Sequence, residues 1–309
     1  MDPNIQSTQP KGNDSRWRVW WRLLRPHTLT ASFVPVLIGT ALALPTGEVK
    51  GSLFLAMLLA SILIQAATNM FNEYYDYVRG LDNEKSVGIG GAIVRDGVSP
   101  KTVMGIAVSF CAAAVGIGIY ICMESSWWLA LVGSLCIAAG YFYTGGPWPI
   151  AYTPFGELVA GLFMGFIIIV ISFFIHTGTV SLASILVSIP IALLIGAILM
   201  ANNIRDRVGD EKNGRRTLAI LLGHTGAVRF LAGMFLFSYL WVTGWVVTGM
   251  FSPWLLIVFL SVPKAVQAIR GFQDKSSPAE MMPAMACTAQ VNTQFGFLLA
   301  LGLFLQTWI

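Results

Sequence analysis

Nine stretches of about 20 apolar residues follow one another along the chain, separated by short polar segments. They cover residues 28–46, 52–73, 102–122, 126–144, 156–176, 181–203, 226–249, 252–271 and 285–307. A helix of this length spans the hydrocarbon core of a bilayer, and only 11% of the 309 residues are charged, against about a quarter in soluble domains. The sequence therefore predicts an all-α membrane protein, a bundle of nine transmembrane helices around a central cavity.

The positions of lysine and arginine predict the orientation of this bundle. With the N-terminus in the cytoplasm, every basic residue except Lys50 falls on the cytoplasmic side, as the positive-inside rule requires. The C-terminus then lies outside, and the formal charge of +4 indicates a basic membrane face and no nucleic-acid binding. Residues 1–15 are polar and are predicted to be a disordered cytoplasmic tail, followed by a single transmembrane domain over residues 16–309.

Two polar cassettes, residues 72–82 and 202–210, end the second and sixth predicted helices. Each contains Asn-x3-Asp, as Asn72 and Asp76 in the first and as Asn202 and Asp206 in the second. Ionisable groups at membrane depth are costly, so they indicate a functional site. The alternative is a pair of solvated helix ends with surface salt bridges, which is less plausible for two matched cassettes than for one.

The two cassettes should open on the same side of the membrane and converge. They are four helices and 130 residues apart, and an even offset predicts two parallel four-helix pseudo-repeats plus a ninth helix. Residues at i and i+4 share a helix face, which aligns Asn202 with Asp206 and Asp210. Asp82 falls off the corresponding face of the first cassette, unless Gly80 ends the helix and lets it return.

Acids interleaved with bases at this spacing suit Mg²⁺ and a diphosphate. Magnesium is commonly held by one or two carboxylates together with phosphate oxygens, and arginine and lysine are the usual partners of phosphate. The candidate metal ligands are Asn72, Asp76, Asp82, Asn202, Asp206 and Asp210, and the candidate phosphate contacts are Arg79, Lys85, Lys212, Arg215 and Arg216.

These cassettes resemble the Asp-rich motifs of the UbiA-type intramembrane prenyltransferases. Residues 25–29, 35–39, 143–147 and 156–157 are also similar to that superfamily, and residues 202–206 continuing to 214–219 resemble the branch that acts on 1,4-dihydroxy-2-naphthoate. The resemblance runs from about residue 17 to the end of the chain. Two positions depart from the usual pattern: Glu73 replaces a common Asp, and Arg215-Arg216 replaces a Gly-Lys-type step.

The resemblance implies a Mg²⁺-dependent transfer of a polyprenyl group from polyprenyl diphosphate to 1,4-dihydroxy-2-naphthoate with decarboxylation, giving demethylmenaquinone. It further implies a catalytic set of Asp76, Asp82, Asp206, Asp210 and Tyr143, with Asn72, Asn202 and Glu157 among the substrate-binding residues. The expected location is a bacterial plasma membrane, with the site open to the cytoplasm and the lipid bilayer as a partner. No obligate protein partner is evident.

Two further features of the sequence leave alternatives open, and a third gives a single expectation. The glycine-rich segment 85–97 is either a lid over the diphosphate or a flexible connector, and Glu157 either orients the aromatic acceptor or caps a helix. Gln65 lies seven residues before Asn72 on nearly the same face, so we expect it to line the cavity.

Two other functions remain as alternatives to this reaction. The same fold could use another aromatic acceptor, such as 4-hydroxybenzoate or homogentisate. A transporter is disfavoured, because many transporters place their charges near the bilayer midplane within an inverted repeat.

Overall fold

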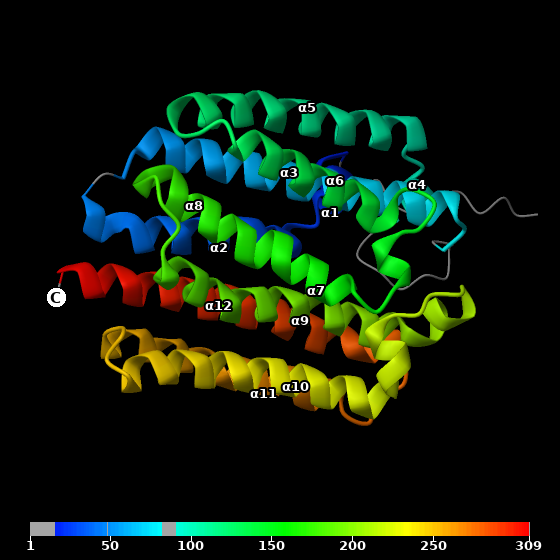
Figure 1. Ribbon diagram of the computed structural model, residues 1–309. Helices are drawn as coiled ribbons and strands as arrows, with labels where there is room; N and C mark the ends of the chain where they lie inside the picture. The colour runs from blue at the N-terminus through cyan, green and yellow to red at the C-terminus, as the bar shows by residue number, and fades with distance from the viewer. Residues whose placement is uncertain (1–15, 48, 82–90, 309) are drawn as a thin grey trace, which may run out of the picture.

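The computed structural model describes residues 16–47, 49–81 and 91–308, and every regular element in these ranges is a helix (Figure 1). The elements of the first half are α1 (Arg16–Leu24), α2 (Pro26–Ala43), η1 (Leu44–Thr46), α3 (Gly51–Val78), α4 (Ala92–Asp96), α5 (Pro100–Glu124), α6 (Leu129–Thr144) and η2 (Ile150–Tyr152). Those of the second half are α7 (Gly156–Ala160), η3 (Gly161–Ile167), α8 (Ile168–Thr177), α9 (Leu182–Lys212), α10 (Leu218–Val247), η4 (Pro253–Ser261), α11 (Val262–Phe272) and α12 (Pro278–Trp308).

The predicted membrane segments all appear as helices. Within the described ranges, eight helical stretches are long and apolar enough to cross a membrane, and α6 is a shorter apolar helix. Together they match the nine predicted segments, so the chain is a multi-pass membrane protein. Hydrogen bonding within each helix satisfies the backbone where no water is present.

Two of the spans are not continuous α-helices. The fifth passes from α7 through η3, a π-helix, into α8, and the eighth begins as the 3-10 helix η4 before α11. Pro263 lies in the first turn of α11, just after this junction. A π-helical turn inside a helix frequently marks a functional site, and η3 lines the cavity described below.

Small residues allow the helices that surround α9 and α12 to approach closely. A Cβ placed on Gly165 would lie 2.5 Å from the Cα of Ala192, and one on Gly296 would lie 2.1 Å from a methyl carbon of Val34. Such close crossings are typical of helix packing in membranes. The largest buried cluster joins α2, α9, α10 and α12, and it supports the helix that bears the second cassette.

The helices that bear the cassettes end on one side of the bundle. The C-terminal ends of α3 and α9 and the segment between α6 and α7 lie together, on the right in Figure 1. α9 begins at the opposite side with a capping box in which Ser181 and Ser184 bond each other's backbone N–H. The predicted meeting of the two cassettes is therefore compatible with the topology.

Candidate functional site

One arginine joins the two cassettes. Arg215 donates from Nη2 to Oδ1 of Asp76 at 2.8 Å and from Nη1 to Oδ1 of Asp210 at 3.1 Å. Asp76 belongs to α3 and Asp210 to α9, so carboxylates 134 residues apart in the chain share one guanidinium. The predicted convergence is thus seen directly for one carboxylate of each cassette.

The same backbone motif ends both helices and sets the positions of these carboxylates. At the end of α3, Gly80 has φ +71°, its N–H bonds the carbonyl of Tyr77, and the N–H of Leu81 bonds the carbonyl of Asp76. At the end of α9, Gly214 has φ +79°, and its N–H bonds the carbonyl of Glu211. The N–H of Arg215 then bonds the carbonyl of Asp210.

These are two Schellman motifs, in which a residue at positive φ lets the chain turn back on the last helical turn. Asp76 and Asp210 occupy the same position in the two motifs, four residues before the glycine. Gly80 therefore ends its helix as predicted. The turn at Gly214 brings Arg215 back beside the carboxylate of Asp210, one turn earlier on the same helix.

The charge state of Arg215 is maintained by its two acidic partners. Burial by itself would lower the pKa of the Arg215 guanidinium, but the carboxylates of Asp76 and Asp210 raise it above its ordinary value. The guanidinium also lies over the ring of Tyr152, 5.1 Å from the centroid. Oδ2 of Asp210 is buried and has no hydrogen-bond partner among the described residues.

Asp206 does not join the Arg215 pair. Both of its carboxylate oxygens accept from the adjacent Arg205, from Nε at 2.8 Å and from Nη2 at 2.5 Å. Nη1 of Arg205 contacts the sulfur of Met285 in α12 at 2.8 Å. The sequence spacing put Asp206 and Asp210 on one face, but the guanidinium of Arg205 draws the Asp206 carboxylate toward α12.

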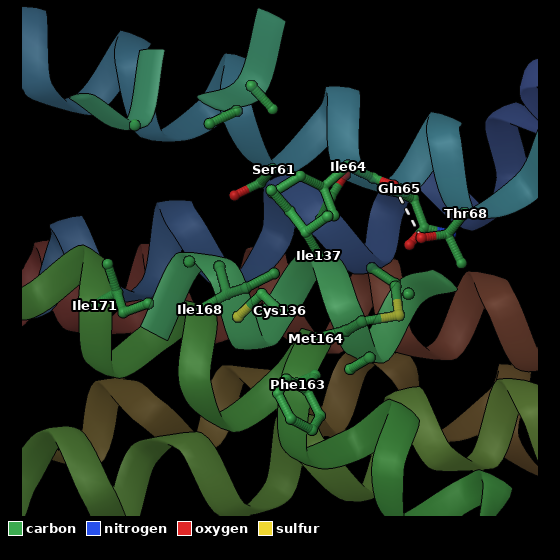
Figure 2. A pocket seen from close by; sticks show the side chains of 18 of the residues that line it. Ser61, Ile64, Gln65, Thr68, Cys136, Ile137, Phe163, Met164, Ile168 and Ile171 are labelled. Carbon is green, nitrogen blue, oxygen red and sulfur yellow. Dashed lines mark hydrogen bonds between the residues drawn. The ribbon is translucent and has the colours of Figure 1, made fainter. Parts of the chain in front are cut away.

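The asparagines and Tyr143 lie at the polar end of an apolar cavity. This cavity of about 330 Å³ is lined by Asn72, Asn202 and Tyr143, and also by Gln65, as predicted. Figure 2 shows side chains of α3, α6 and the η3–α8 segment around it, Gln65 among them. Nε2 of Gln65 donates to Oδ1 of Asn69 at 3.2 Å. Most of its exposed wall is apolar, so it can hold a hydrocarbon group next to the polar cassettes.

Two hydrogen bonds fix the remaining groups at the polar end. Oδ1 of Asn72 accepts from the hydroxyl of Thr144 at 2.8 Å. Glu157, buried at the start of α7, accepts at Oε1 from Nδ2 of Asn203 at 2.8 Å, while its Oε2 has no partner among the described residues. Glu157 is therefore tied to the second cassette by its side chain. Sequence reasoning did not assign Asn203 this role, although it directly follows Asn202.

Arg25, Asn69 and Glu73 form a buried polar group that sequence reasoning did not place in the site. Asn69 donates to the carbonyl of Leu24 and to the hydroxyl of Thr28, both at 2.9 Å. Glu73 is only 1% exposed and pairs with Arg25 at 3.3 Å. Arg25, Asn69 and Thr28 line the cavity. The i, i+4 spacing of Gln65 and Asn69, within the predicted membrane segment 52–73, was the available signal.

The remaining predicted residues fall into three groups. Arg79 is directed to the loop after α6, where it donates to the carbonyls of Thr144 and Gly146. Lys212 and Arg216 are exposed beside the end of α9. Asp82, Lys85 and the first six residues of the predicted lid segment lie outside the described residues, while the rest of that segment contains α4.

Comparison with known proteins agrees with the fold and with the resemblance of the cassettes. The model of the UbiA prenyltransferase family matches residues 32–286. The 1,4-dihydroxy-2-naphthoate octaprenyltransferase of Bacillus subtilis (strain 168) is 58% identical over 293 residues, which cover 95% of this chain and 94% of that protein. The protein of the same name from Escherichia coli (strain K12) is 27% identical over 95% of this chain and 97% of its own length.

Solved structures show the same fold at low sequence identity. The apo structure of a UbiA homologue from Aeropyrum pernix K1 has a TM-score of 0.68 at 15% identity, covering 91% of this chain and 98% of that one. A UbiA homologue from Archaeoglobus fulgidus bound to DMAPP and Mg²⁺ has a TM-score of 0.61 at 16% identity, with the same coverage. With a family match over most of its length and a relative at 58% identity, the chain belongs to the UbiA prenyltransferase family.

Proposed function

We propose that the chain transfers a polyprenyl group from polyprenyl diphosphate to 1,4-dihydroxy-2-naphthoate, with loss of the carboxylate as CO₂. The observation that supports this most strongly is the 58% identity, over nearly the whole of both chains, to the B. subtilis protein with that name. The site is consistent with the reaction. A cluster of acids and bases lies beside a cavity with a mostly apolar wall, as a diphosphate with a hydrocarbon tail requires.

The residues at the polar end fit a divalent cation, and we propose Mg²⁺. The buried Oδ2 of Asp210 has no partner among the described residues, and a buried carboxylate oxygen without one is unusual. Carboxylate and amide oxygens are also suitable donors for this hard cation. The proposed ligands are Asn72, Asp76, Asn202, Asp206 and Asp210, with Asp82 from outside the described residues. When bound, Mg²⁺ would supply positive charge to the departing diphosphate.

Arg215 is the leading candidate for a direct phosphate contact. Its planar guanidinium already donates one hydrogen bond to each of two carboxylates, and the same pair of N–H donors suits two oxygens of a phosphate. Lys212 and Arg216 are exposed close by on the chain and would act as further cationic contacts. Lys85 is retained as a candidate outside the described residues.

Arg79 was predicted to bind phosphate, but its contacts support a role in holding the loop after α6. It donates to two carbonyls and lies over the rings of Tyr75 and Tyr152, at 5.2 and 5.5 Å from their centroids. We expect Arg79→Lys to lose about tenfold in kcat/KM, nearly as much as Arg79→Ala. The reason is that the lysine ammonium cannot reproduce the planar guanidinium, whose two nitrogens donate to two carbonyls. Steady-state kinetics with both variants test this. Recovery of activity in the lysine variant would instead favour a simple phosphate contact.

At the allylic carbon of the donor, one bond breaks and a different bond forms. The C–O bond to diphosphate breaks and its electron pair leaves with the diphosphate. The ring carbon that bears the carboxylate then forms the new C–C bond, and the carboxylate departs as CO₂, leaving the electron pair of its C–C bond to restore the aromatic ring. The apolar wall would exclude water from the allylic cation, and the ring of Tyr143, which lines the cavity, would stabilise it.

Glu157 is proposed to orient the acceptor. Its Oε1 is fixed by Asn203, while Oε2 is buried without a partner among the described residues. A hydroxyl of the dihydroxynaphthoate would donate to that free oxygen. A Cβ built on Gly156, which precedes Glu157, would lie 3.2 Å from the hydroxyl of Tyr143, a residue that lines the cavity, so the acceptor ring would then lie beside the allylic carbon.

The polar end of the bundle is proposed to face the cytoplasm of a bacterial cell. The cassettes and most of the basic residues lie toward this end. At the other side of the bundle, Lys50 pairs with Glu124 at 3.5 Å. The positive-inside rule then places the N-terminus inside, the C-terminus outside and the cavity mouth at the cytoplasmic surface.

A direct assay tests this proposal. Purified protein in lipid vesicles would receive Mg²⁺, labelled farnesyl diphosphate, and 1,4-dihydroxy-2-naphthoate, 4-hydroxybenzoate or homogentisate in separate reactions. We expect labelled product and released CO₂ only with the naphthoate, and no product after EDTA treatment until Mg²⁺ is restored. Product with another acceptor alone would overturn the proposed substrate. Absence of diphosphate release with all three would overturn the enzymatic function.

A further inference from the structure

The ring of Tyr152, in the segment between α6 and α7, lies beside the arginines that follow both cassette helices. The guanidinium carbon of Arg215 is 5.1 Å from the centroid of this ring, and that of Arg79 is 5.5 Å from it. Arg79 directly follows α3, and Arg215 directly follows the turn at Gly214 that ends α9. One aromatic residue outside the cassettes therefore contacts a cation beside each of them.

Backbone hydrogen bonds fix the position of Tyr152. It is the last residue of η2, and its N–H bonds the carbonyl of Pro149 at 3.0 Å. The carbonyl of Tyr152 accepts from the N–H of Arg216 at 3.0 Å. Arg215 thus lies over the ring of the same residue whose carbonyl bonds the next residue in the chain, so side chain and backbone join the end of α9 to one point.

Arg79 joins the same segment to the other cassette helix. It donates to the carbonyls of Thr144 and Gly146, where α6 ends and the segment begins, and it also lies over the ring of Tyr75. These carbonyls and rings are neutral groups, so the contacts do not depend on the state of the acids in the site. The ring of Tyr152 is therefore held from the α3 side without help from Asp76.

Arg215 needs a partner other than its two carboxylates. Asp76 and Asp210 accept from it at 2.8 and 3.1 Å, but in the proposed function these acids also hold a divalent cation, whose charge repels the guanidinium. An aromatic face attracts a cation through the ring quadrupole, more strongly where water is excluded. The side chain of Arg215 is only 14% exposed, so the contact with Tyr152 remains effective when the acids take a second partner.

We propose that Tyr152 is a positioning residue, whose ring holds the guanidinium of Arg215 at the diphosphate site while Asp76 and Asp210 hold the cation. The inference rests on the proposed function and deepens it, because Arg215 is the leading candidate for the phosphate contact. Tyr152 acts through Arg215 and is assigned no contact with substrate. The ring carries the effect and the hydroxyl does not, since the guanidinium lies over the ring.

Binding of inorganic diphosphate tests the inference without turnover. Wild type and variants, purified in detergent, would be titrated with diphosphate at saturating Mg²⁺ by isothermal titration calorimetry. We expect Tyr152→Leu to raise the Kd about tenfold, because leucine keeps apolar bulk but has no ring quadrupole, and Tyr152→Phe to stay within about twofold of wild type. Tyr152→Met is a second variant without a ring. Phe155→Leu is the matched control, because Phe155 is a 60% exposed aromatic residue of the same segment, and its Kd should equal that of wild type.

An Arg215→Ala background shows whether the ring acts through Arg215. In that background Tyr152→Leu should change the Kd little further, because substitutions that act through one contact are not additive. In turnover assays Tyr152→Leu should raise the KM of the donor and leave that of the acceptor unchanged, a split that general loss of structure would not give.

Three results would overturn the inference: a wild-type Kd in both variants without a ring, an equal loss in Tyr152→Phe, or an undiminished effect of Tyr152→Leu in the Arg215→Ala background. Thermal unfolding of each variant identifies any loss that comes from misfolding. If wild type itself binds no diphosphate with Mg²⁺, the proposed function fails, so the two failures are distinguishable.

Discussion

Asp76→Asn should reduce turnover by about 10²–10³-fold, the effect seen when one preorganised electrostatic group is removed from an active site. The substitution keeps the size of the side chain and one oxygen for Arg215, but it removes the negative charge and replaces the other oxygen by an amide NH₂. Because Asp76 shares Arg215 with Asp210, the loss leaves the guanidinium partly uncompensated and removes a proposed cation ligand. Steady-state kinetics at saturating donor, with a Mg²⁺ titration, would measure both effects.

Glu124→Gln is the control for this experiment. Glu124 is an acid at the end of α5 that pairs with Lys50 across the far side of the bundle, so its charge should not affect turnover. Asp206→Asn should also abolish most activity if Asp206 leaves Arg205 to bind the cation. Full activity in both Asp76→Asn and Asp206→Asn would contradict the proposed metal site.

Glu73→Ala should destabilise the folded protein by about 3–5 kcal/mol, the usual result of removing one partner from a buried ion pair. Oε1 of Glu73 accepts from the backbone N–H of Gly91 at 2.8 Å and of Ile93 at 3.3 Å, and Oε2 accepts from Arg25 at 3.3 Å. The carboxylate thus caps the N-terminus of α4 from a different helix. Its removal leaves two N–H groups and a guanidinium without this acceptor.

The measurement is the midpoint of thermal unfolding in detergent, compared with Glu124→Ala as an exposed acid on another helix. Glu73→Gln should lie between wild type and alanine, because its amide oxygen still accepts one hydrogen bond. A shift in Glu73→Ala no larger than that of Glu124→Ala would show that the capping contacts contribute little. This result bears on function too, since Glu73 lies between Asn72 and Asp76 on α3.

Comparison of the cassettes shows why sequence spacing misaligns them. The Asn-x3-Asp pattern pairs Asp76 with Asp206, at an offset of 130 residues. The Schellman motifs at Gly80 and Gly214 instead pair Asp76 with Asp210, one helical turn further. In either alignment the matched acid lies on the same face of α9, because Asp206 and Asp210 are four residues apart and four residues make about one turn. Position relative to the helix end then decides which carboxylate reaches Arg215.

The sequence alone determined the membrane class, the nine helical segments and the places where polar groups interrupt them. These depend on local properties, namely the hydropathy of windows about 20 residues long and glycines that can adopt positive φ. It also predicted that Gln65 lines the cavity, because a helix face follows from residue number. Family-specific motifs added the expected chemistry, and the comparisons agree with the family.

Only the tertiary structure decided which charges meet. Arg215 reaches Asp76 across 139 residues, Arg79 turns to the carbonyls of the loop after α6, and Asp206 turns to Arg205. The first two choices depend on which acceptors the packed helices bring within about 3 Å of a guanidinium. In the third, Arg205 is the neighbour of Asp206 in the chain, and its contact with Met285 of α12 is the tertiary one. The cavity likewise exists only between helices, where the volume left unfilled is set by packing and not by the hydropathy of any one segment.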